Sequence, residues 1–210
     1  MSILSSGLTQ KILDYWFHGH FNQPTLQDAA KATLMKFWFS SNPEVDAAIK
    51  EQFEESLLNY IEIQNDMLGN CDSALALTIL LDQFPRNIYR GQSKAFDYVD
   101  TALQIALTSI EKGYDQLVHP VARSFFYLPL MHSEDMSMQT MCVEKYQTMA
   151  NEVPEDMKPM GQYQLKFAIE HFDIVKRFGR FPHRNKLLGR ESTQDEIEFL
   201  AEGASDFGQK

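Results

Sequence analysis

Apolar and aromatic residues recur every three or four positions along nearly the whole chain, and this spacing constrains the fold most strongly. We find no segment with the alternation of apolar and polar residues that a β-strand needs. The helix starts are clear: Asn42-Pro43-Glu44 combines a capping residue, a first-turn proline and an acid at the positive helix end. The sequence therefore predicts an all-α fold of about eight to ten short helices, stacked as antiparallel hairpins.

Capping residues and prolines indicate where individual helices begin and end. We expect Thr9 to cap the first helix and Ser133 to cap a later one. Pro85 is expected to end the most apolar helix, because the residue before a proline avoids helical backbone angles. Pro129 is expected to break the helix that begins at Pro120.

Composition bounds the class of protein. The length of 210 residues favours one helical domain over residues 1–202 with a frayed tail at 203–210, two small domains being the alternative. The formal net charge of -10 argues against nucleic acid as a partner. Cys71 and Cys142 stand in apolar helical patterns and are expected to be buried free thiols. Without a leader segment or a membrane-spanning run, we expect a cytoplasmic protein with no membrane partner.

Arginine is distributed very unevenly along this acidic chain. All seven arginines lie between Arg86 and Arg190, and the first 85 residues carry only lysine as positive charge. Six of the seven flank two copies of one motif, Phe-Pro-Arg-Asn at 84–87 and Phe-Pro-His-Arg-Asn at 181–185. Arginine presents a rigid planar set of donors to carboxylate, phosphate or carbonyl groups. The distribution therefore suggests one polar site where the two motifs meet.

Two interpretations of these arginines remain open. In the structural one, phenylalanine fills the core, proline stops the helix, and arginine bonds the carbonyl groups exposed at the helix end. In the functional one, the partner is an anionic ligand, since segment 176–190 contains six Lys or Arg and no Asp or Glu. The candidate ligand-binding residues are Arg86, Arg177, Arg180, Arg184 and Asn185, with Asp82 and Glu134 expected to hold the guanidinium groups in place.

Two histidines are candidate catalytic residues. His183 lies among arginines, which disfavour its protonation, and a neutral imidazole there could act as a base. His132 stands at an expected helix start. The alternative for both is a simple bond to a backbone carbonyl, and His171 is expected to be a satisfied core histidine. No metal site is expected, because His132 and Glu134 are only two residues apart among cationic neighbours, and we find no cofactor-binding motif.

Three longer segments carry a resemblance to a known family. They read Leu-Leu-Asp-Gln-Phe-Pro-Arg-Asn at 80–87, Tyr-Leu-Pro-Leu-Met-His-Ser-Glu at 127–134 and Arg-Phe-Gly-Arg-Phe-Pro-His-Arg-Asn at 177–185. Together they resemble the signature of the bacterial domain-of-unknown-function family 924, over nearly the whole chain. The resemblance implies an all-helical, TPR-like fold. It implies no activity, substrate or cofactor.

Three functions follow from these observations. The leading hypothesis is a TPR-like binding protein whose Arg-rich polar pocket takes a small anionic molecule or a peptide carboxylate. The first alternative is a hydrolase or transferase that uses the same pocket, with His183 or His132 as base and arginines stabilising a negative transition state. The second alternative is a scaffold that binds a protein partner. The sequence leaves the ligand, the partner and the oligomeric state open.

Overall fold

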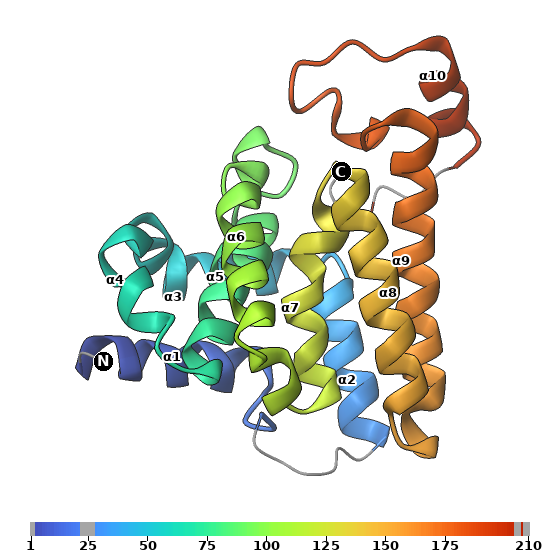
Figure 1. Ribbon diagram of the computed structural model, residues 1–210. Helices are drawn as coiled ribbons and strands as arrows, with labels where there is room; N and C mark the ends of the chain where they lie inside the picture. Colours follow the sequence, from blue (N-terminus) through green and yellow to red (C-terminus); the bar gives the residue numbers. More distant parts are fainter. Residues whose placement is uncertain (1–2, 22–27, 204–206, 208–210) are drawn as a thin grey trace. The chain divides into compact units, whose positions relative to one another are not determined.

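The computed structural model describes residues 3–21, 28–203 and 207 (Figure 1). Within this part of the chain there are ten α-helices and no strand, which confirms the all-α prediction. No helix among the described residues is long and apolar enough to cross a membrane. The expected frayed tail at 203–210 lies outside the described residues except for Gly203 and Phe207.

The elements follow one another in a simple order. They are α1 (Ile3–Trp16), α2 (Asp28–Phe39), α3 (Pro43–Leu58), α4 (Tyr60–Met67), α5 (Cys71–Ile88), η1 (Ser93–Phe96), α6 (Val99–Glu111), η2 (Tyr114–Leu117), α7 (Pro120–His132), α8 (Met136–Glu152), η3 (Glu155–Met157), α9 (Lys158–Phe178), η4 (Pro182–Arg184) and α10 (Gln194–Ala201).

The chain divides into two compact units. The first comprises Met1–Arg90 and Lys94–Phe126, and the second comprises Gly91–Ser93 and Tyr127–Lys210. Helix α7 contributes residues to both units. The single domain over 1–202 and the TPR-like stacking of hairpins stay predictions.

Helix α5 is the centre of the first unit. It packs against α1, α3, α4 and α6, and every residue from Ser73 to Ile88 is buried. The ring of Phe84 lies 4.6 Å from that of Phe53 and 5.5 Å from that of Trp16, measured between centroids. These rings anchor α5 to α3 and α1, because aromatic pairs at such distances add to the stabilisation that burial provides.

Both internal prolines lie within helices, so the two expected breaks are wrong. Helix α5 continues through Pro85 to Ile88, and α7 continues through Pro129 to His132. A proline removes one backbone hydrogen bond and costs about 3 kcal/mol in a helix interior. Burial of the whole of α5 around Pro85 outweighs that local cost.

Two expected caps are also wrong, while a third is confirmed. Helix α1 begins before Thr9, whose hydroxyl instead lies 3.3 Å from that of the buried Ser73. The cap of α8 is Asp135 rather than Ser133, because the Asp135 carboxylate accepts the amide hydrogens of the first turn. Asn42 caps α3 as predicted and accepts from the Glu44 amide at 2.9 Å.

The second unit is built on the hairpin of α8 and α9. The two helices lie side by side (Figure 1), and a Cβ atom added at Gly161 would meet the Ala150 backbone at 3.1 Å. The absence of a side chain at Gly161 therefore permits this close approach. Helix α9 ends at Gly179, whose φ of +70° is the left-handed conformation that glycine adopts without strain.

Candidate functional site

The two Phe-Pro motifs belong to different units, and each forms its own polar network. In the first unit, Arg86 Nη1 donates to the carbonyl oxygen of Asp82 at 3.0 Å, and Nη2 lies 3.6 Å from the Asp82 carboxylate. Burial lowers the pKa of Arg86, whereas the negative charge of Asp82 acts in the opposite direction. Arg86 therefore interacts with its own helix, as the structural interpretation proposed.

Asp46 holds the end of this first motif. Asn87 donates to it at 2.8 Å, and Arg90 forms a two-pronged ion pair with it at 2.7 and 2.9 Å. The contact ties the end of α5 to the start of α3. Sequence reasoning missed Asp46, because the ion pair joins residues far apart in the chain and no local spacing indicates it.

In the second unit, Glu134 faces two guanidinium groups. Arg190 donates to both of its oxygens, at 2.6 and 3.0 Å, and Arg184 Nη1 lies 3.9 Å away. The Phe181 amide donates to the same carboxylate at 2.9 Å. Burial by itself would raise the pKa of Glu134, but these donors and charges lower it below its ordinary value. Glu134 thus stays ionised, and its single charge is shared between two arginines.

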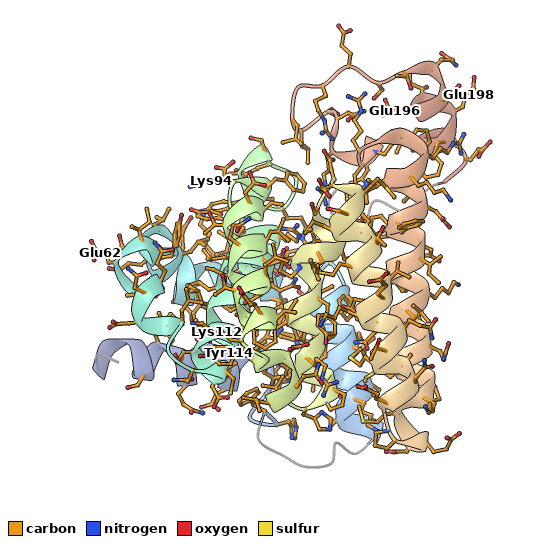
Figure 2. The ribbon with its side chains drawn as sticks, viewed as in Figure 1. Glu62, Lys94, Lys112, Tyr114, Glu196 and Glu198 are labelled. Atoms are coloured by element: carbon orange, nitrogen blue, oxygen red, sulfur yellow. The ribbon has the colours of Figure 1, made fainter. Side chains whose placement is uncertain are left out.

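Glu196 lies on α10 (Figure 2) and accepts hydrogen bonds from the other polar side chains around the second motif. Arg180 forms a two-pronged pair with it at 2.7 and 2.8 Å, and Asn185 donates to it at 3.2 Å. The hydrogen bond from Arg180 is the main reason why the pKa of Glu196 falls to about 2. Glu196 also closes a capping box with Thr193. The Thr-x-x-Glu spacing was the available signal for this residue, which the sequence analysis did not select.

Among the described residues, no ion pair links Arg177 to these networks. Its exposed guanidinium lies over the rings of Phe178 and Phe199, at 4.6 and 5.5 Å from their centroids. Such stacking uses the flat cationic face and leaves the edge donors directed elsewhere.

Two imidazoles and one guanidinium group contact the buried Phe181, and a third imidazole lies near one of them. The ring centroids of His132 and His171 are 6.4 Å apart, and those of His171 and His183 lie 5.5 and 5.6 Å from Phe181. The Arg184 guanidinium stacks on Phe181 at 4.2 Å and donates to the His132 carbonyl at 2.9 Å. We call His132, His171, His183 and Arg184 the histidine–arginine cluster.

His171 is the buried member of this cluster, with 4% of its surface exposed. Its Nδ1 lies 2.8 Å from the Phe167 carbonyl oxygen. Burial first, and then the positive charges of its neighbours, lower its pKa from the ordinary 6.5 to about 3. The ring is therefore neutral near pH 7, with Nδ1 as the donor and Nε2 carrying the lone pair. His132 and His183 are only half-buried.

The described residues contain no group of three His, Cys, Asp or Glu side chains that could hold a metal ion.

Comparison with known proteins identifies the family of this chain. The model of the family described as "Bacterial protein of unknown function (DUF924)" matches residues 12–204. The chain belongs to DUF924. A solved structure of a protein of unknown function from Agrobacterium tumefaciens is 34% identical to this chain, with a TM-score of 0.77. The match covers 95% of this chain and 99% of that protein. The comparison with curated proteins found no match. Membership in DUF924 confirms the resemblance, and it assigns no activity.

Proposed function

We propose that this protein binds a small anion, a carboxylate or a phosphate, at the histidine–arginine cluster of the second unit. The observation that carries the proposal is the sharing of Glu134 between Arg184 and Arg190. Two guanidinium groups thus converge on one carboxylate, and the half-buried imidazoles of His132 and His183 lie close to Arg184 and its stacking partner Phe181. Guanidinium groups bind carboxylate and phosphate oxygens through paired donors, so this concentration of positive groups suits a small anion.

The surroundings of Arg184 suit a small ligand. Only 7% of the Arg184 side chain is exposed, so a bulky polyanion has little access to it, whereas His132 and His183 are half-buried and reachable. Imidazoles beside a guanidinium add hydrogen-bond donors for an oxyanion. Arg190 Nε donates a hydrogen bond to Asn185 Oδ1 at 3.0 Å, and this bond keeps the loop after η4 in place.

The central imidazole of the cluster is a poor candidate for acid–base catalysis. An efficient base has a pKa near the working pH, and the pKa of about 3 makes the central His171 a weak one. The predicted roles of His132 and His183 as bases, and of Arg86, Asp82, Arg177 and Arg180 as ligand-binding residues, stay predictions.

Isothermal titration calorimetry with inorganic phosphate and with propionate tests the proposal. We expect wild type to bind at least one of them and Arg184→Lys to weaken binding about tenfold, because lysine lacks the planar donor set. His183→Asn, at a half-buried position, gives a second test in a variant with little risk to folding. Both variants should lower the affinity.

Arg90→Lys is the matched control, since Arg90 is an ion-paired arginine of the other unit. It should leave the affinity unchanged. If neither anion binds wild type, or if Arg90→Lys weakens binding as much as Arg184→Lys, the proposed site is wrong.

A further inference from the structure

Four polar side chains are buried on α5, the central helix of the first unit. Asp82, Gln83, Arg86 and Asn87 are each less than a tenth exposed. Asn87 donates to Asp46 and has a structural role there. Buried polar groups in folded proteins are normally hydrogen-bonded, so a buried group without a partner calls for an explanation. Such groups occur in the remaining three side chains.

The Arg86 guanidinium uses only part of its hydrogen-bonding capacity. Nη1 donates to the Asp82 carbonyl oxygen at 3.0 Å, whereas Nη2 lies 3.6 Å from the Asp82 carboxylate, which is too far for a hydrogen bond. Nη2 is buried and has no hydrogen-bond partner among the described residues. By contrast, Arg90 and Arg180 each donate two hydrogen bonds to one carboxylate. Arg86 thus presents a buried donor without an acceptor.

Gln83 supplies an acceptor on the same side of α5, because residues three positions apart are neighbours on a helix surface. Its Nε2 donates to the Asp82 carboxylate at 2.5 Å, and this bond identifies the other end of the amide as the carbonyl oxygen Oε1. Within the part of the chain that the structure describes, it is the one hydrogen bond of the Gln83 side chain. Oε1 can therefore accept from a further donor.

We infer that Gln83 and Arg86 bind a neutral carboxamide group. The carbonyl oxygen of the ligand accepts from Arg86 Nη2, and its N–H group donates to Gln83 Oε1. A neutral group is favoured because Asp82 already provides one negative charge next to Arg86, and a second negative charge in a buried site is unfavourable. The inference concerns the first unit and does not depend on the anion site proposed above.

The surroundings restrict the size of this ligand. Gln83 and Arg86 are only 7% and 9% exposed, so a bulky molecule has little access to them. The ring of Phe96 lies 5.9 Å from the guanidinium carbon and adds an apolar surface beside the polar groups. The expected ligand is therefore an amide that carries a short apolar group.

Ligand-observed NMR titration of the full chain with propionamide and with 2-butanone tests the inference. The two probes share their ethyl and carbonyl groups and differ only in an amino group against a methyl group. We expect wild type to bind propionamide about three- to tenfold more tightly, which is the contribution of one hydrogen bond. In Gln83→Leu this preference should disappear, whereas the affinity for 2-butanone should stay, because Arg86 is unchanged.

Gln116→Leu is the matched control, since Gln116 also donates to the aspartate that precedes it, at 2.8 Å to Asp115. It should keep the preference for propionamide. Arg184→Lys, in the second unit, should keep it too, so failure of this inference and failure of the anion site are distinguishable. If Gln83→Leu does not fold, Gln83→Met, with an unbranched apolar side chain of similar length, takes its place.

Three results would overturn the inference. They are no binding of propionamide to wild type, equal affinities of wild type for propionamide and 2-butanone, and a preference for propionamide that persists without Gln83. Loss of the preference in Gln116→Leu would place the amide elsewhere in the first unit and would overturn it as well.

Discussion

At the residue scale, burial decides which ionisable groups keep their charge. His171 is enclosed by rings and by positive neighbours, so its neutral form is favoured. Glu134 and Glu196 are enclosed as well, but guanidinium donors hold them ionised. Burial thus neutralises the imidazole, whereas hydrogen bonds and ion pairs with arginines keep the two carboxylates charged.

His171 predicts a pH dependence of stability. Its pKa in the folded state, about 3, lies below the ordinary 6.5 of an unfolded chain. Between these values the unfolded state binds a proton that the folded state does not, so the free energy of unfolding should fall as the pH drops, by up to about 1.4 kcal/mol per pH unit. Urea unfolding between pH 6.5 and pH 4.5 measures this slope.

His171→Phe keeps a ring at this position and removes the titrating group. We expect a clearly shallower slope over the same pH range. An unchanged slope would show that His171 is not the group responsible.

Glu134 is expected to stabilise the second unit through its charge. In Glu134→Gln, Arg184 and Arg190 lose their shared carboxylate, and we expect a loss of about 1–3 kcal/mol in the free energy of unfolding. Glu170→Gln, which alters an exposed pair with Lys166 on the same unit, should cost no more than about 0.5 kcal/mol. Chemical denaturation of the two variants in parallel makes the comparison, and equal losses would contradict it.

At the element scale, the end of α7 depends on one side chain of α8. Gln139 is fully buried. Its Nε2 donates to the carbonyl oxygens of Met131 and Ser133 at 2.7 and 2.6 Å, and the carbonyl oxygen of Leu130 lies 3.4 Å from the same nitrogen. The last carbonyl groups of a helix have no partner within the helix. Gln139 provides one, and this helps to explain why α7 ends at His132 with its last carbonyl groups hydrogen-bonded.

Gln139→Leu should therefore destabilise the protein markedly. Because buried carbonyl groups would lose their donor, we expect a cost of about 1–3 kcal/mol. Gln147→Leu, the same substitution at an exposed position of α8, should change stability by less than about 0.5 kcal/mol. Urea unfolding measures both effects as shifts in the urea concentration at which half of the protein is unfolded, provided that the slope of the unfolding free energy against urea is the same in both variants. Similar midpoints for the two variants would refute the role of Gln139.

At the scale of the whole molecule, each unit carries one free cysteine. Cys142 is buried as predicted, but Cys71 is only half-buried because it starts α5 at the edge of its unit. Burial is the main reason why the pKa of Cys71 rises, to about 11, and burial raises the pKa of Cys142 as well. The reactivity of each thiol thus reports on the integrity of its own unit.

Alkylation with iodoacetamide, followed by peptide mass spectrometry, should show slow reaction at both cysteines in native buffer. The raised pKa of Cys71 lowers its thiolate fraction roughly a hundredfold. Cys142 should react still more slowly, since it requires local opening, and both should react rapidly in urea. Faster labelling of Cys142 than of Cys71 in native buffer would contradict this picture.

Much of the fold could be predicted from local spacing. The helical periodicity and the Asn42 cap of α3 depend on residues near one another in the chain, and these predictions are confirmed. The misplaced breaks at Pro85 and Pro129 have one common cause: packing of the whole helix outweighs a local backbone penalty that sequence rules treat as decisive.

The sequence by itself determined the all-helical class, the family and the concentration of arginine around two Phe-Pro motifs. Only the tertiary structure decided the partners of those arginines: Asp46 for Arg90, Glu196 for Arg180, Glu134 for Arg190, and Phe181 as the stacking face for Arg184. It also brought Phe207 onto His171. The physical reason is that helix formation depends on residues three or four apart, whereas ion pairs and ring stacks join side chains that the chain brings together only when it folds.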